Sequence, residues 1–156
     1  MSKIGRASRN ASLKRVEGLS ADKTVAAAES GEVYIVSAAS TVTLPPVKAG
    51  AYLKFIVSAE ITSASALVLK TATADDGMMV GAITVNIVGG TGAATDNAAA
   101  ARAVAGDNHD KLTIGDAAKK LYPGSRVECV CDGTNWVVTG LLLVEHADLT
   151  AEFGDQ

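Results

Sequence analysis

Aromatic residues are scarce in this chain of 156 residues, which has one tryptophan, three tyrosines and two phenylalanines. Apolar residues nevertheless make up 48% of the sequence. Any core must therefore be built mainly from Val, Ile, Leu and Ala side chains. The length suits one domain with a real core and is too short for two comfortable ones.

Cysteine is also rare, and its spacing excludes the common uses of a thiol. Cys129 and Cys131 are the only two, and residues two apart on one strand cannot form a disulfide without distortion. The spacing is not C-x-x-C, and no further cysteine could complete a zinc site. We interpret both as small buried hydrophobic residues, which indicate no oxidising compartment.

No segment carries a recognised catalytic motif. There is no G-x-S-x-G nucleophile elbow, and the run Gly89–Ala94 lacks the Lys-Ser/Thr of a phosphate-binding loop. The polar cluster Gly106–Lys111 could in principle share a divalent cation with Asp75 and Asp76, but a turn with solvated acids explains it as well. We expect no enzyme, no metal and no cofactor.

Long hydrophobic runs are absent. No apolar run reaches transmembrane length, and the basic N-terminus is not followed by the apolar stretch of a signal peptide. We therefore expect a soluble chain with no membrane partner. The formal net charge of −3 argues against general nucleic-acid binding by the whole domain.

What the sequence does contain is an uneven distribution of charge. The first sixteen residues have five basic side chains and no acid, whereas the rest has nine basic and seventeen acidic residues. Residues 1–22 are polar, Ser-rich and aperiodic, so we expect an extended arm outside the core. Residues 146–156 are expected to form an acidic tail. The basic residues of the arm are Lys3, Arg6, Arg9, Lys14 and Arg15.

Short alternating apolar segments separated by turn residues fill residues 23–145. They predict an all-β fold of about eight strands, an antiparallel, jelly-roll-like β-sandwich or barrel. A short helical turn is expected within residues 23–30. The Ala- and Gly-rich insertion 89–109 is interpreted as a surface loop with helical tendency. Strands are expected at Glu32–Val36, Thr41–Leu44, Ala51–Ser58, Ala66–Ala72, Met78–Val88 and Asp110–Gly115, followed by a turn at 116–124 and a hairpin from residue 127 through Val144.

Leu53, Phe55 and Val57 share the face of their strand that we expect to point into the core. In the hairpin, Asp132-Gly133 is typical of a type I′ turn, because that turn needs a positive φ that glycine accepts. Apolar residues on both hairpin faces predict that both are covered. Trp136 is expected to anchor the core; a role in stacking on a ligand is the alternative.

Three segments together resemble a domain that recurs in virion proteins of tailed bacteriophages. They are "STVTLPPVKAGAYLKFIV" (Ser40–Val57), "DKLTIG" (Asp110–Gly115) and "PGSRVECVCDGTNWVVTG" (Pro123–Gly140), with D-G-T-N-W the most specific piece. The resemblance covers about Gly31 to Leu143. The basic arm and the insertion 89–109 lie outside the shared pattern. It implies a small capsid decoration (cement) protein, or a tail-fibre or minor structural domain.

The resemblance implies a structural virion protein, made in the cytoplasm of a bacterial host and bound to the capsid exterior. There it would bridge neighbouring major capsid subunits, as a homotrimer at local three-fold positions. The basic arm would reach across acidic shell surface, with avidity from repetition in the trimer. The acidic tail could complement the arm of a neighbour.

Other readings stay open. The arm could be a solvated tail, or could contact packaged DNA if the protein faced inward. The chain could be a tail or minor virion component with a receptor- or glycan-binding β-sandwich, although it has few aromatic rings to expose for stacking on sugars. The remaining alternatives for the function are a non-viral β-sandwich binding module and an enzyme.

Overall fold

The computed structural model of the chain describes residues 15–74, 77–88, 100–103, 109–145 and 150–155. Within these residues it contains twelve β-strands and one short 3-10 helix, so the predicted all-β class is confirmed. The helix, η1 (Ala27–Glu29), lies where a short helical turn was expected. The strands are β1 (Val16–Leu19), β2 (Lys23–Thr24), β3 (Val33–Val36), β4 (Ser40–Thr43), β5 (Tyr52–Val57), β6 (Ile61–Lys70), β7 (Met79–Ile87), β8 (Ala100–Ala103), β9 (Lys111–Leu121), β10 (Arg126–Cys131), β11 (Trp136–Val144) and β12 (Thr150–Gly154).

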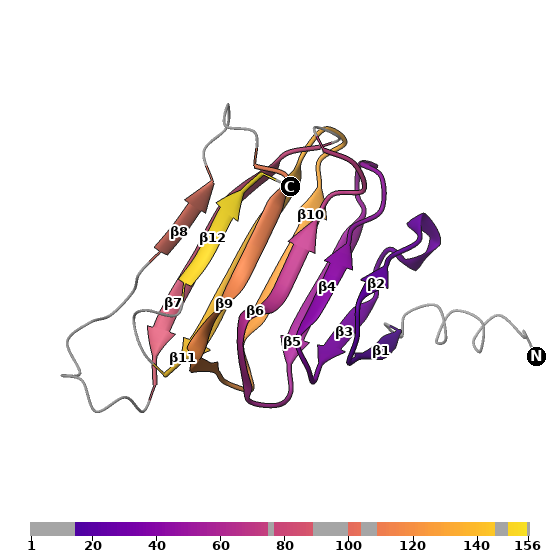
Figure 1. Cartoon of the computed structure of the whole chain (residues 1–156). Coiled ribbons are helices and arrows are strands. Elements are labelled where there is room, and N and C mark those ends of the chain that lie inside the picture. Colours follow the sequence, from indigo (N-terminus) through magenta and orange to yellow (C-terminus); the bar gives the residue numbers. More distant parts are fainter. Residues whose placement is uncertain (1–14, 75–76, 89–99, 104–108, 146–149, 156) are drawn as a thin grey trace, which may run out of the picture.

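The strands form one continuous sheet that folds into two facing layers (Figure 1). The first layer has the order β1-β3-β5-β10-β11-β7-β8, and the second has the order β2-β4-β6-β9-β12. The layers join where Val144 of β11 pairs with Leu121 of β9, and β8 lies beside β12. The sheet is thus nearly closed into a barrel, which agrees with the prediction of a β-sandwich or barrel.

Parallel pairs are the main departure from the antiparallel arrangement predicted. β1, β3 and β5 run parallel in the first layer, and β2, β4 and β6 run parallel in the second. After each of these strands the chain crosses to the opposite layer instead of turning back beside it. A strand in the opposite layer therefore supplies the long connection that parallel neighbours need.

The space between the layers is filled mainly by aliphatic side chains. Leu53, Phe55 and Val57 are all buried, and Trp136 is fully buried, which confirms these four as core residues. The rings of Tyr34 and Phe55 stack with their centroids 5.4 Å apart. Several of the few aromatic rings of the chain thus lie in the core.

Within the described chain, the hairpin of β10 and β11 is covered on one face only, so the prediction that both faces are covered is wrong. Cys129 and Cys131 point inward and are buried free thiols. Burial raises the pKa of the Cys129 thiol to about 12, which keeps it protonated and unreactive at neutral pH. On the other face, Val130 is 43% exposed and Val137 is 36% exposed.

The turn of this hairpin is centred one residue later than predicted. The Asp132 N–H donates to the Asn135 carbonyl (3.1 Å), which makes Gly133 and Thr134 the central residues. Gly133 has a φ of 108°, a conformation that favours glycine. The Asp132 carboxylate accepts from the N–H groups of Asn135 (2.7 Å) and Thr134 (2.8 Å), and these bonds hold its pKa below the usual value.

Several segments expected outside the strands belong to the sheet. Leu19 of β1 is buried, and so is Phe153 of β12, although neither position was assigned to the core. Each of these segments forms a strand because it pairs with a strand that is distant in sequence, and composition alone does not predict such pairing. The affected predictions are the arm (1–22, now entered by β1), the insertion (89–109, entered by β8), the turn at 116–124 (entered by β9) and the tail (146–156, entered by β12).

Candidate interaction surface

The basic arm joins the body at Arg15. The Arg15 carbonyl accepts the N–H of Val33 (2.9 Å), and its guanidinium lies 2.9 Å from Glu32 Oε1. The Arg15 side chain is 76% exposed, whereas that of Glu32 is only 4% exposed. Arg15 therefore fastens the base of the arm to the body. The other four basic residues predicted as contacts lie outside the described residues: Lys3, Arg6, Arg9 and Lys14.

An ion-pair cluster lies beside this attachment point and consists of Arg15, Glu17, Lys23, Glu29 and Glu32. The Lys23 ammonium lies 2.8 Å from Glu17 Oε1 and 3.0 Å from Glu29 Oε1. Carboxylate oxygens of the three glutamates lie within 4.8 Å of one another. Such close carboxylates repel unless they are neutralised, and the ion pairs with Lys23 and Arg15 offset this repulsion.

The cluster shifts two pKa values. The hydrogen bond from the Lys23 ammonium to Glu17 is the main reason that the pKa of Lys23 is raised above 10.5. The Ala26 N–H, and then Lys23, hold the pKa of Glu29 below 4.5. A carboxyl whose pKa is lowered by folding stabilises the fold above its unfolded pKa, and this contribution is lost as the pH falls through the folded value.

We expect Lys23→Met to lower the free energy of unfolding by about 1–3 kcal/mol at pH 7, because it leaves poorly solvated carboxylates without their counter-charge. The difference from wild type should shrink as the pH falls below 4.5 and through the lowered pKa of Glu29 in the folded chain. Urea denaturation at neutral and acidic pH measures both effects. Lys120→Met is the matched control: its pair with Glu60 (3.1 Å) is about half exposed on both sides, so the change should cost clearly less than Lys23→Met does. Equal losses in the two variants would contradict a special role for the cluster.

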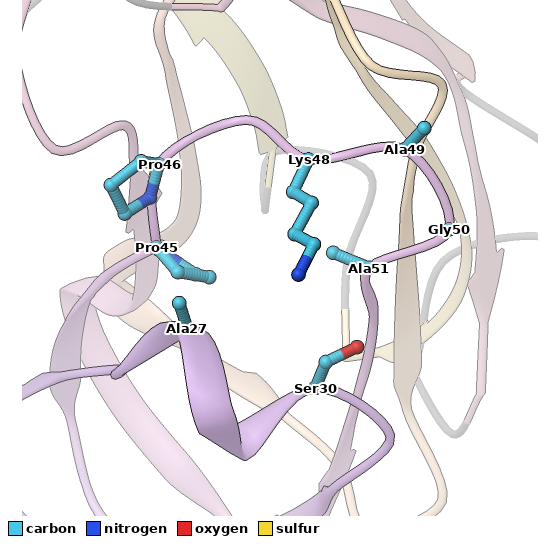
Figure 2. Close-up of a pocket in the computed structure, with 8 residues that line it drawn as sticks. All are labelled: Ala27, Ser30, Pro45, Pro46, Lys48, Ala49, Gly50 and Ala51. Atoms are coloured by element: carbon cyan, nitrogen blue, oxygen red, sulfur yellow. The ribbon is translucent and has the colours of Figure 1, made fainter.

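A small cavity lies between η1 and the loop that leads into β5 (Figure 2). Its volume is about 140 Å³, and its lining contains no acidic side chain. The side chain of Lys48 extends into the middle of the ring of lining residues (Figure 2). Within the described part of the chain, no carboxylate lies within ion-pair distance of the Lys48 ammonium. The lining residues are Ala27, Ser30, Pro45, Pro46, Lys48, Ala49, Gly50 and Ala51.

The loop that carries Lys48 is held by the end of the β10–β11 hairpin. The Lys48 N–H donates to the Cys131 sulfur (3.2 Å), and the Gly50 N–H donates to the Cys131 carbonyl (2.8 Å). A Cβ added at Gly133 would lie 3.2 Å from the Ala49 Cβ, so the turn packs closely against the loop. The hairpin therefore fixes one wall of the cavity.

An apolar row crosses the outward face of the first layer, beginning at the edge of this cavity. It consists of Tyr52 (β5), Val130 (β10), Val137 (β11) and Val80 (β7), which are successive register partners. Their side chains therefore lie next to one another on adjacent strands. Tyr52 directly follows Ala51 of the cavity lining, and its N–H donates to Ser30 of the same lining (3.1 Å), so the apolar row begins beside the cavity.

The charged side chains on the same face as the apolar row are either paired with an opposite charge or positive. Lys54 and Glu128 are register partners, and their side chains form an ion pair at 2.6 Å. Glu128 is the one acid at the outward positions of β5, β10, β11 and β7 in the described chain. Arg126, two residues along β10, is exposed. This face thus differs from the chain as a whole, which is acidic.

The outward face of the second layer has a different character. Thr43 lies opposite Lys70 on the adjacent strand, and Lys70 lies opposite Lys111. Polar side chains also occupy Thr41 and Thr113 in the next row. The two outward faces are therefore chemically distinct: among the described residues, only the first has an apolar row across four strands, exposed at Val130 and Val137 and half-buried at Tyr52 and Val80.

Comparison with protein-family models, curated proteins and solved structures finds no match to this chain. Among the described residues, no helix has the length and apolarity needed to cross a bilayer. The polar cluster at 106–111 is only partly described, and the predictions for Asp75, Asp76 and His146 fall outside the described residues.

Sequence reasoning missed both the cavity and the apolar row. Lys48 lies between the predicted strands Thr41–Leu44 and Ala51–Ser58, and both faces of the hairpin that contains Val130 and Val137 were predicted to be covered. Alternation in β10 and β11 did place these valines on the face opposite Trp136. It could not tell that nothing in the described chain covers that face, because coverage depends on the path of distant segments.

Proposed function

We propose that this chain is a structural virion protein that binds the outer surface of a bacteriophage capsid and bridges neighbouring major capsid subunits. The segments Ser40–Val57 and Pro123–Gly140, which resemble phage virion proteins, support this proposal. The combination of an uncharged apolar surface with a basic arm is the observation that carries it. A protein built to hold other proteins together needs such surfaces and needs no catalytic groups.

Charge complementarity supports a shell partner with an acidic surface. The arm contributes five positive charges and no negative one, and a disordered or extended segment can cover a large area of a partner. The rest of the chain is acidic and would be repelled by the same surface. The apolar row is an exception, because its nearest acid is already paired with Lys54. We therefore place the apolar row against the shell, next to the area that the arm covers.

The proposed assembly is a homotrimer at local three-fold positions of the capsid. The apolar row spans four strands, about 15 Å across at the usual strand spacing, and is too small by itself for a stable interface, which buries about 800 Å² on each side. Three linked copies would add their weak contacts. Sedimentation of the purified chain tests the trimer separately from capsid binding.

A tail or minor virion component with a receptor- or glycan-binding surface is the second candidate. Tyr52 in the apolar row is the observation in its favour, because a partly exposed ring can stack on a sugar. The remaining members of the row are valines, which lack that ability. We therefore prefer the capsid decoration role.

Val137→Glu is expected to weaken binding to capsids by at least about tenfold while the chain stays folded. It places a negative charge in the centre of the apolar row, where it would be desolvated against an acidic partner. Thr43→Glu is the matched control, since it adds the same charge beside Lys70 on the second layer. Cosedimentation with capsids measures binding, and circular dichroism checks the fold. If both variants bind as wild type does, the apolar row is not the contact surface.

The copy number in purified virions tests the proposed function itself. Quantitative mass spectrometry against the major capsid protein should give a ratio close to that of an abundant decoration protein. A few copies per particle would instead place the chain in the tail or at the portal vertex. Absence from virions would refute the proposal and restore the non-viral alternatives.

A further inference from the structure

We propose that the cavity around Lys48 is a binding site for a carboxylate on a short aliphatic stem, and that its occupant is an Asp or Glu side chain of the shell protein. The second half of this inference rests on the proposed function, since it names the partner chemistry of the same surface. The first half concerns the isolated chain alone and can be tested without capsids.

The cavity offers hydrogen-bond donors to a ligand and little that would repel an anion. The Lys48 ammonium extends into it (Figure 2), and no carboxylate lines it. The Ser30 hydroxyl oxygen accepts the Tyr52 N–H (3.1 Å), which leaves its own O–H free to donate. A lysine with no ion-pair partner in the described chain, next to a hydroxyl donor, selects for an anionic group.

The size and the walls of the cavity decide which anion fits. Pro45, Pro46 and three alanines make most of the lining apolar, so an anion with an aliphatic stem gains contacts there that phosphate cannot make. Lys48 and most of the other lining residues are exposed, so the cavity is open to a ligand from outside. The volume of about 140 Å³ suits the end of one side chain, with its methylene groups against the prolines and its carboxylate at Lys48.

The site is held in shape before any ligand arrives. The loop on one side is fixed through the Cys131 sulfur and carbonyl, and the Ala51 N–H donates to the Lys48 carbonyl (3.0 Å). On the other side, Glu29 holds η1 through the Ala26 N–H (2.6 Å) and Lys23. Binding then costs little ordering of the protein, which is the condition under which a single weak ion pair can be detected.

The position of the cavity connects it to the rest of the proposed interface. It lies beside Tyr52 of the apolar row, since the Tyr52 N–H donates to Ser30 of the lining. The helix η1 contributes Ala27 to the lining and Glu29 to the ion-pair cluster that anchors the arm. A shell surface contacted by both arm and row would therefore also pass over Lys48. That surface must be acidic to bind the arm, so it would present Asp or Glu side chains at this point.

The first experiment is a titration of the full isotope-labelled chain with acetate, followed by amide NMR at constant ionic strength. Acetate is expected to bind in the millimolar range, with saturable shifts confined to Ser30, Lys48, Gly50 and Ala51. Acetamide, which has the same shape without the charge, should cause no saturable shift. Lys48→Gln should weaken acetate binding by about fivefold or more, whereas Lys70→Gln should leave it unchanged. Shifts that do not saturate, or that persist in Lys48→Gln, would refute the site.

The second experiment asks what occupies the site. Lys48→Glu is expected to weaken cosedimentation with capsids more than Lys70→Glu does, without changing the oligomeric state. If Lys48→Glu instead dissociates the oligomer, the occupant is a second copy of this chain and the assignment to the shell is wrong. If acetate binds but capsid binding is unaffected, the partner assignment is likewise wrong. Because the acetate titration needs no capsid, its failure refutes the site and leaves the proposed function to be judged by virion copy number.

Discussion

Trp136→Ala should lower the free energy of unfolding by about 3–5 kcal/mol, the usual cost of removing a large aromatic side chain from a core. Trp136 is fully buried, and its backbone is paired with Cys131 of β10 and Met79 of β7. Its side chain thus fills the space under three strands of the first layer. Truncation to alanine would leave a cavity that these paired strands cannot easily close, because their backbones are held in register.

The loss should come from packing rather than from hydrogen bonding. The indole Nε1 has no hydrogen-bond partner within the described structure, so Trp136→Phe should cost clearly less than Trp136→Ala. Val137→Ala, next along the same strand but partly exposed, should cost less than about 1 kcal/mol. Urea denaturation followed by far-UV circular dichroism compares the three variants without relying on tryptophan fluorescence. A loss below about 1 kcal/mol for Trp136→Ala would contradict its role as a core anchor.

Removal of residues 1–14 should reduce capsid binding by on the order of 100-fold and leave the fold intact. The deletion takes away Lys3, Arg6, Arg9 and Lys14, and each exposed ion pair contributes up to about 1 kcal/mol. It deliberately spares Arg15, because Glu32 is buried beside it and would lose its counter-charge. Cosedimentation with capsids that lack the protein measures the effect, and unchanged thermal unfolding shows that the body is intact.

A second variant separates charge from chain contact. Changing the four basic residues to glutamine keeps the length of the arm and removes its charge. If electrostatic attraction dominates, this variant should bind as poorly as the deletion, and wild-type binding should weaken as salt is added. Normal binding by the truncated chain would refute the role of the arm, and a strong effect of the deletion alone would indicate contacts made by the backbone.

The ion pair between Arg15 and the buried Glu32 sets the boundary of the deletion. From charge alone, Arg15 belonged with the other arm residues and would have been removed with them. In the structure it is paired with a buried glutamate, and β1 begins at the next residue. A deletion that included Arg15 and Val16 would disturb the sheet, so weaker binding could not be assigned to the arm.

The sequence alone determined the all-β class, the inward faces of β5 and β10, and the burial of Trp136. These follow from alternation with period two and from side-chain hydrophobicity, which are local properties. The turn at Gly133 was also visible, to within one residue, because its conformation is encoded in the residues that form it. Local rules suffice where a few neighbouring residues decide the outcome.

Only the tertiary structure decided which strands are neighbours. A strand that ends at Pro45-Pro46 can either turn back in its own layer or cross to the other, and the sequence of the turn is compatible with both. The crossing makes β3 and β5 parallel neighbours, and it brings Ala27 of η1 and the following Ser30 into the same cavity lining as Lys48. The apolar row arises from pairing between strands of the first layer that lie far apart along the chain. The cavity forms where residues 27–30 meet the loop that leads into β5.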